Sequence, residues 1–346
     1  MSKVDLAFKP DVAPQPQLAQ ASLAIVNGRA LRDLINLDAA ILLVRQAMRE
    51  LSAGHIDAPE RWTMPASEHG VLALMPGAMP GRNRFGIKVL SLFEAMVGGM
   101  DLPGHQGLML LFDAENGRPL SVIDADSLTG LRTAAASAVA TDLLARGDST
   151  TLAMIGCGEQ ARWHVRALRR VRPIHELRVW GRSSINTHAF AVDMEAEGVR
   201  VTVYPTPRET IEGADIVCTV TRSDEPLIFG DWLSPGQHLN LVGSSTNKSR
   251  EVDEVAVARG RFIVDSRSHA LSQGGELRAA IAAGVVSPDY IHAEIGEVLS
   301  GEMPGREDPE MITIYKSLGH VAQDLAVAIA VHENAAQSPH TVWAAW

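Results

Sequence analysis

Three basic residues lie in or beside apolar segments of the first half of the chain. Lys88 interrupts the apolar run 85–90, where a lysine is either an edge charge that faces solvent or a functional group in a pocket. Arg132 stands at the start of the small-residue segment 131–140, which predicts a helix. A cation in the first turn of a helix opposes the helix dipole, so we expect an anion to compensate it. Together with Arg61, which alone would be structural or solvated, they indicate a site that captures a carboxylate.

A glycine-rich loop follows the apolar run 151–155. Gly156, Gly158 and Ala161 have the spacing G-x-G-x-x-A, which is found in dinucleotide-binding folds. Gly156 allows a tight turn, Gly158 lets the backbone approach a pyrophosphate, and Ala161 permits close packing of the next helix on the strand. The N–H groups and the dipole of that helix favour phosphate. The spacing alone is weak evidence, so the surrounding elements decide.

From Thr151 onward apolar runs alternate with helix-compatible segments. We expect strands at 151–155, 177–181, 199–203, 215–220, 238–243 and 262–265. This alternation is typical of a parallel, doubly wound sheet, and it places the glycine loop after the first strand, as a true fingerprint requires. The sequence therefore predicts an α/β protein with a Rossmann domain.

The end of the second predicted strand bears on the choice of cofactor. An acidic residue there binds the ribose 2′-hydroxyl of NAD, whereas an arginine accommodates the 2′-phosphate of NADP. This strand ends without Asp or Glu and is followed by Arg182 and Ser183. We predict NADP(H) in preference to NAD(H); the alternative is a solvated arginine beside a serine helix cap. The other predicted cofactor contacts are Thr133, Glu159, Gln160, Thr219, Val242 and Gly243.

The segments that flank this domain have a different pattern of apolar residues. Residues 1–20 read as a mobile arm, and a helix is predicted from near Asp38. Apolar runs at 71–75, 85–90, 107–112 and 119–123 predict a mainly antiparallel sheet, with a hairpin turn at 114–117. The stretch 312–334 predicts a long helix that packs back on this first part.

Composition excludes several classes of protein. The 346 residues have globular hydrophobic and charged contents of 46% and 21%, and the net charge of −10 argues against nucleic-acid or anionic-membrane partners. The two cysteines and the histidines lack metal-binding spacing, so we expect neither a metal site nor a disulfide framework. Without a signal peptide or a long apolar segment, a cytoplasmic location is expected.

Several motifs in the same order resemble the ornithine cyclodeaminase/mu-crystallin family over roughly residues 23–335. Besides the segment 88–92 and the glycine loop, they are Leu-Thr-Gly-Leu-Arg-Thr-Ala-Ala at 128–135, Gly-Gly-Glu at 274–276, Gly-Glu-Val-Leu-Ser-Gly at 296–301, Lys-Ser-Leu-Gly at 316–319 and Gln-Asp-Leu-Ala at 323–326.

The resemblance implies a homodimer that acts on a small imino or amino acid. It implies an α+β substrate-binding and dimerisation domain made of residues 21–145 and 320–346, with the Rossmann domain at 146–319. By analogy, Arg61 and Arg132 bind the substrate carboxylate, and Lys88 lies beside the reacting carbon and nitrogen. Lys88 would then donate a proton or polarise an imine.

One position departs from the cyclodeaminase pattern. Those enzymes carry an aspartate, thought to be a general base, just after the Val-Gly pair that ends the fifth Rossmann strand, and Ser245 stands there in this chain. Serine is no unaided base near neutral pH, although it can orient water or an imine nitrogen. The family's ketimine reductase branch has a serine in this region, so the change favours imine reduction.

The leading hypothesis is an NADP-dependent reductase of a cyclic ketimine such as pyrroline-2-carboxylate or piperideine-2-carboxylate, with Lys88 and Ser245 as catalytic residues. Three alternatives stay open: an L-amino-acid dehydrogenase of arginine or alanine type, an ornithine or lysine cyclodeaminase, and a non-catalytic ligand-binding protein. The sequence does not identify the substrate side chain.

Overall fold

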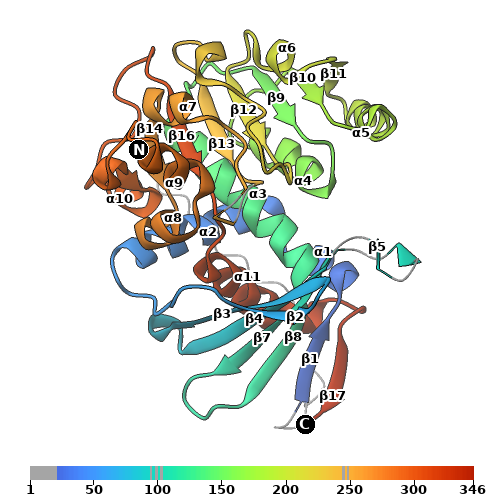
Figure 1. Cartoon of the computed structure of the whole chain (residues 1–346). Helices are drawn as coiled ribbons and strands as arrows, with labels where there is room; N and C mark the ends of the chain where they lie inside the picture. The colour runs from blue at the N-terminus through green and yellow to red at the C-terminus, as the bar shows by residue number, and fades with distance from the viewer. Residues whose placement is uncertain (1–21, 94–95, 98–99, 102–103, 244–245, 248) are drawn as a thin grey trace, which may run out of the picture.

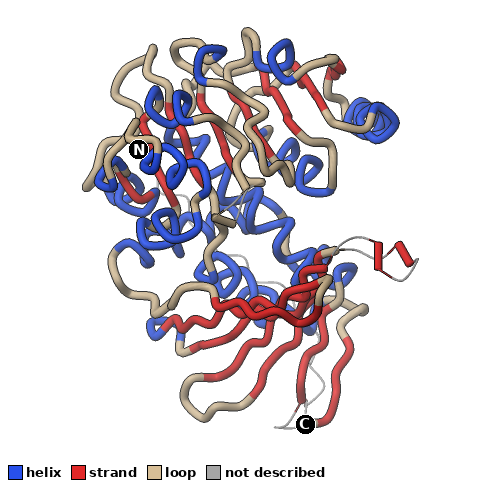
Figure 2. Tube along the Cα trace, viewed as in Figure 1, coloured by secondary structure: helices blue, strands red, loops and turns tan. Residues whose placement is uncertain are grey.

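The computed structural model describes residues 22–346 except for 94–95, 98–99, 102–103, 244–245 and 248. The predicted N-terminal arm and Ser245 lie outside the described residues. Two large sheets lie one above the other in Figure 1, with helices between them in Figure 2. Within the described ranges, no helix is long and apolar enough to cross a membrane.

The lower sheet has seven strands in the order β17-β1-β8-β7-β4-β3-β2. The four predicted strands and the hairpin turn are confirmed, and β2, β1 and β17 are additional. Because β1 pairs with β17, this sheet joins the two ends of the described chain. The strands are β1 Ser22–Val26, β2 Trp62–Ser67, β3 Gly70–Met79, β4 Arg84–Phe93, β7 His105–Asp113, β8 Pro119–Asp124 and β17 Val342–Ala345, and the short pair β5 Met96–Val97 and β6 Met100–Asp101 stands apart.

The upper sheet is parallel, with the order β11-β10-β9-β12-β13-β16-β14-β15. The six predicted strands are present with ends shifted by a residue or two, which confirms the doubly wound Rossmann fold. They are β9 Thr151–Ile155, β10 Glu176–Trp180, β11 Arg200–Val203, β12 Ile216–Thr219, β13 His238–Leu241 and β14 Arg261–Val264. The sheet also contains β16 and, at one edge, the short strand β15 Ala293–Glu294.

The C-terminal helix begins later than predicted. Residues 313–316 form strand β16 (Thr313–Lys316) between β13 and β14, and α11 covers only Val321–Asn334. The strand is buried along its whole length, and a short buried apolar run cannot be assigned to helix or strand from periodicity alone. Gly319, with φ +77°, separates the two elements.

Two other helix starts also differ from the prediction. Helix α2 (Leu37–Ser52) is capped by the side chain of Asn36, which leaves Asp38 in the first turn; a further helix, α1 (Gly28–Leu34), precedes it. Helix α3 runs from Ala125 to Leu144 and is capped by Asp124, so Arg132 lies well inside the helix. The expectation that Arg132 opens this helix was therefore wrong, because the acidic cap upstream of it starts the helix earlier.

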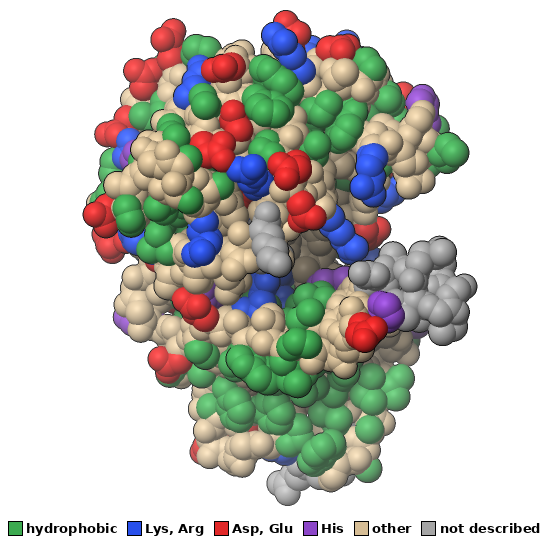
Figure 3. Space-filling view, viewed as in Figure 1, with side chains coloured by type: hydrophobic (Ala, Val, Ile, Leu, Met, Phe, Trp, Pro, Cys, Tyr) green, Lys and Arg blue, Asp and Glu red, His purple; other side chains and the backbone are tan. Residues whose placement is uncertain are grey.

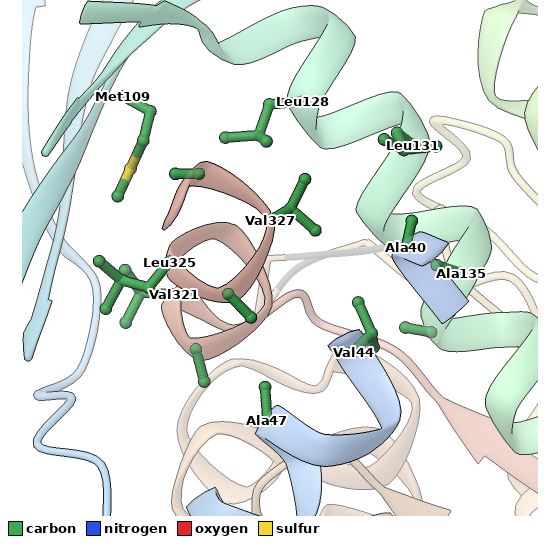
Figure 4. Close-up of a cluster of buried hydrophobic side chains, with 14 of the residues drawn as sticks. Ala40, Val44, Ala47, Met109, Leu128, Leu131, Ala135, Val321, Leu325 and Val327 are labelled. Carbon is green, nitrogen blue, oxygen red and sulfur yellow. The ribbon is translucent and has the colours of Figure 1, made fainter. Parts of the chain in front are cut away.

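Helix α11 packs between the lower sheet and helices α2 and α3 (Figures 1 and 4). Two glycines let it approach the strands: a Cβ on Gly77 would lie 2.8 Å from Val321, and one on Gly86 would lie 3.2 Å from Leu325. Alanines on α2 and α3 face the same cluster. This close packing places the polar N-terminal turn of α11 beside β4.

Candidate active site

A cavity of about 500 Å³ lies between the two sheets. Residues from both halves line it, and Figure 3 shows basic side chains in the hollow. The lining includes Lys88 of β4, Arg61 and Arg132, which the sequence places in one site. It also includes the predicted cofactor contacts Glu159, Gln160, Val242 and Gly243 from the nucleotide-binding half, and Thr133 from helix α3.

The anion expected near Arg132 is Asp324 of α11. Its Oδ1 accepts a 2.9 Å hydrogen bond from Arg132 Nε, and its Oδ2 lies 2.8 Å from Lys88 Nζ. Asp324 is fully buried, and Lys88 and Arg132 are 1% and 4% exposed. Arg132 also donates to Gln323 Oε1 at 2.9 Å. One carboxylate thus holds two cations from separate elements, since isolated charges are costly to bury.

Burial and neighbouring charge set the protonation of this cluster. Burial, followed by the nearby Arg132 cation, lowers the pKa of Lys88 to about 7. Burial alone would raise the pKa of Asp324, but Arg132 and Lys88 together hold it below its ordinary value. Burial and Arg132 also lower the pKa of Arg61. Three basic groups stand beside two carboxylates, Asp324 and Asp265, and this excess of cations favours the binding of a further anion.

The loop after β16 connects Arg61 to this cluster. Arg61 Nη2 donates to the carbonyl oxygen of Leu318 at 3.1 Å, and the backbone N–H groups of Leu318 and Gly319 each donate to Asp265 Oδ2 at 2.9 Å. A Cβ on Gly319 would lie 2.6 Å from Arg132 Nη1, so the glycine leaves room for the guanidinium. Sequence reasoning missed Asp265, although its place directly after β14 is where site residues of α/β sheets lie.

The glycine loop fits a dinucleotide. Gly156 has φ +112°, and Ala161 is fully buried in helix α4 (Glu159–Leu168). Gly158 caps this helix, and a Cβ placed there meets no atom within 4 Å, so the backbone is open to a ligand. Among the described residues, Thr133 Oγ1 and Gln160 Oε1 are buried without a hydrogen-bond partner, and both residues line the cavity. These groups are available to a bound cofactor.

The predicted 2′-phosphate site lies at the same edge of the sheet, beyond the cavity lining. Arg182 follows β10, which neighbours β9, and its side chain is exposed. Ser183 caps α5 (Ser184–Ala196), with Oγ 3.4 Å from the N–H of Asn186. The serine therefore has the capping role that sequence analysis weighed as the alternative.

Thr219 is placed differently from the other predicted cofactor contacts. It is fully buried at the end of β12 and does not line the cavity. Its hydroxyl donates to Glu251 Oε2 at 2.7 Å. The Thr219 side chain therefore contacts Glu251, which sequence reasoning did not single out, and not the cavity.

Comparison with known proteins gives concordant matches. The model of the ornithine cyclodeaminase/mu-crystallin family matches residues 24–339. The Δ1-pyrroline-2-carboxylate reductase of Bacillus cereus is 33% identical over 90% of this chain and 97% of its own length.

Two solved structures are similar throughout. The Thermococcus litoralis Δ1-pyrroline-2-carboxylate reductase in complex with NADH and L-proline has a TM-score of 0.87 at 32% identity, covering 90% of this chain and 97% of its own. An archaeal alanine dehydrogenase dimer with bound NAD has a TM-score of 0.88 at 32% identity, covering 94% of this chain and 99% of its own.

Replacing Asp324 tests the buried charge cluster. We expect Asp324→Asn to lower the free energy of unfolding by about 3–5 kcal/mol, because it leaves two buried cations without their carboxylate. Urea denaturation at neutral pH measures the change. Asp193→Asn is the matched control, because Asp193 pairs with Arg162 on the surface and is 51% exposed; it should cost about 1 kcal/mol or less. Equal losses for the two variants would contradict this account.

Proposed function

Because the chain belongs to the ornithine cyclodeaminase/mu-crystallin family, we propose that it reduces a cyclic ketimine to the corresponding L-amino acid with NADP(H). Pyrroline-2-carboxylate and piperideine-2-carboxylate are the proposed substrates. The general class is that of an NAD(P)-dependent oxidoreductase acting on CH–NH or CH–NH2 groups.

The buried lysine in the cavity carries this proposal. A cyclic imino acid has a carboxylate for Arg61 and Arg132 and an apolar ring for the wall formed by Met75, Leu90 and Leu92. A reduced nicotinamide supplies the hydride that the imine carbon accepts. Lys88 supplies the proton for the imine nitrogen, and a pKa of about 7 makes it an effective donor near neutral pH. Asp324 holds the lysine in place.

An L-amino-acid dehydrogenase is the second candidate, favoured by the similarity to the archaeal alanine dehydrogenase. The same cations can hold an amino acid by its carboxylate while the lysine accepts a proton. Ornithine cyclodeamination is disfavoured by the sequence, because Ser245 stands where a general base is needed.

Preference for NADP(H) rests on Arg182. A guanidinium pairs readily with a phosphate, and the hydroxyls of Ser183 and Ser184 follow it. The two similar solved structures hold NADH and NAD, so this preference would distinguish the chain from them.

We also propose that two copies of the chain associate through the outer face of the lower sheet. Strand register and alternation place apolar side chains in rows on the face opposite Lys88, and Figure 3 shows apolar side chains over this half. Phe85 stacks on Phe112 at 5.0 Å, and Leu108 is 49% exposed. Other members are Leu74, Pro76, Ile87, Val89 and Leu110. A contiguous row of exposed and half-buried apolar side chains of this kind favours association.

The reductase activity has a specific pH dependence. We expect NADPH oxidation with pyrroline-2-carboxylate or piperideine-2-carboxylate, with kcat/KM falling about tenfold per pH unit above about pH 7, because deprotonation of Lys88 removes the proton donor. A spectrophotometric assay of NADPH oxidation across pH measures kcat/KM. A parallel assay with free amino acids and NADP tests for the dehydrogenase activity.

The variant Lys88→Gln serves as the control for that profile. It should lose about 100-fold or more in kcat/KM and lack this pH limb. A limb that persists in the variant belongs to the substrate imine instead. No NADPH or NADH oxidation with any imine would overturn the reductase assignment.

Removing the guanidinium of Arg182 tests cofactor choice. Arg182→Ala should raise the Kd for NADPH about 10- to 100-fold, because a charge-assisted phosphate contact is lost, and leave the Kd for NADH within about twofold. Fluorescence titration gives both constants. Arg200→Ala, which removes another arginine with a 72% exposed side chain, is the control. Equal effects on the two cofactors would refute the 2′-phosphate site.

A charge on the outer sheet should block association. We expect Leu108→Lys to convert a dimer into a monomer, because it buries an unpaired ammonium in an apolar interface. Light scattering after size-exclusion chromatography measures the mass. Leu42→Lys makes the same change at a leucine that is 66% exposed on α2 and should leave the dimer intact. A wild-type monomer at micromolar concentration would exclude this interface.

A further inference from the structure

A buried group of charges lies beneath the floor of the cavity. Glu251, Glu276 and Lys316 are each 1% exposed or less, and the proton transfer proposed above uses none of them. They lie where the adjacent strands β12, β13 and β16 end. The residues that follow these strands, Thr221, Gly243 and Ser317 among them, line the cavity.

The Glu251 carboxylate accepts four hydrogen bonds of 2.7 Å. Its Oε1 accepts from the backbone N–H and the hydroxyl of Thr221. Its Oε2 accepts from the hydroxyl of Thr219 and from the backbone N–H of Gly243. A carboxylate has the acceptor sites for this set and carries no donor. It therefore fixes the backbone of two cavity-lining segments from behind.

Glu276 and Lys316 connect Glu251 to strand β16. Glu276 Oε1 accepts from the backbone N–H of Glu251 at 3.2 Å, and Lys316 Nζ lies 3.1 Å from Glu276 Oε2. At Gly243 an added Cβ would lie 2.4 Å from Glu251 Oε1 and 2.0 Å from the carbonyl oxygen of Thr221. The two strand ends are therefore packed against the carboxylate without spare room.

The position of these strands says which part of a cofactor they face. The glycine loop follows β9, and the order of the sheet reverses between β9 and β12. In doubly wound folds each half of the sheet carries one half of the dinucleotide, across this reversal. Strands β10 and β11 lie on the side of Arg182, so β12, β13 and β16 lie on the nicotinamide side.

We propose that Glu251 is a positioning residue for the nicotinamide half of the cofactor. By holding Thr221 and Gly243 it sets the surface on which the nicotinamide ring rests, while the adenosine half depends on β9, β10 and the glycine loop. This inference rests on the nicotinamide dependence proposed above. It does not depend on the identity of the imine.

Binding measurements separate this role from general stabilisation. Glu251→Gln is nearly isosteric, but in either orientation its amide nitrogen faces a backbone N–H, of Thr221 or of Gly243, which cannot accept a hydrogen bond. We expect it to raise the Kd for NADPH about tenfold or more. The Kd for 2′-phospho-ADP-ribose, which lacks the nicotinamide, should change less than about twofold. If the protein prefers NAD(H), the same two titrations are made with NADH and ADP-ribose.

Milder variants keep the test decisive if Glu251→Gln does not fold. Thr219→Val removes one donor to Oε2 from a residue outside the cavity lining and should show the same selective loss, of about threefold or more. Thr219→Ser keeps the hydroxyl and should restore binding. Glu254→Gln is the control, because Glu254 pairs with Arg250 near the surface; it should alter neither constant.

Each outcome has a defined meaning. A higher Kd for the whole dinucleotide, with the Kd of the nicotinamide-free fragment unchanged, supports the positioning role. This holds even if the protein reduces no imine. Equal weakening of both ligands, or loss of thermal stability with no change in either constant, would overturn it. If the wild-type protein reduces no imine but the variants still weaken binding of the whole dinucleotide selectively, only the proposed reaction is contradicted.

Discussion

The buried contact of Asp324 with Lys88 and Arg132 is the constraint around which the chain is arranged. Two basic side chains can occupy the interior only because a carboxylate reaches both. That carboxylate comes from α11, which must lie close to β4 and α3 at once. The glycines of β3 and β4 and the alanines of α3 are what allow this approach. The small residues are therefore needed for the buried charges, because only close packing of α11 lets Asp324 reach both cations.

The same contact gives the site its chemical character. A lysine in water would remain protonated and strongly hydrated, whereas burial beside a second cation brings the pKa of Lys88 to about 7. Asp324 limits this shift without cancelling it, since it is shared with Arg132. The cluster keeps an excess of positive charge toward the cavity, where Arg61 adds to it. Such an excess of positive charge favours an anionic ligand over a neutral one.

Sequence patterns were sufficient wherever a local rule fixes the structure. The glycine loop, the alternating strands and the antiparallel runs each depend on periodicity or backbone geometry over a few residues, and these features were confirmed. Arg61, Lys88 and Arg132 could be grouped from the sequence as cations in or beside apolar segments, and the structure places all three in the lining of one cavity. Lys88 and Arg132 also lie in motifs that resemble the family, whereas Arg61 lies in none of them. The N-cap at Asn36 and the early start of α3 were missed because several polar residues near a helix start can cap it.

Other features could not be read locally. Strand β16 was assigned to a helix because a buried apolar run lacks a diagnostic period. Asp265 and Glu251 are ordinary acidic residues in the sequence, and their importance arises from backbone N–H groups that only the folded chain brings to them. The place of Asp324 on the last helix predicts a pairing with a basic residue of the first part of the chain, and the structure confirms such a pairing, with Lys88 and Arg132. Which basic residues the carboxylate meets depends on tertiary packing, which spacing in one sequence does not specify.

The pairing of β1 with β17 has a consequence for the order in which the chain can assemble during synthesis. The Rossmann strands β9 to β16 are contiguous, so that sheet can form from one uninterrupted stretch. The lower sheet cannot be completed, nor can Lys88 meet Asp324, until residues 321–345 have left the ribosome. Long-range closure of this kind is slow. In a nascent chain Lys88 therefore lacks its carboxylate partner until α11 has been synthesised.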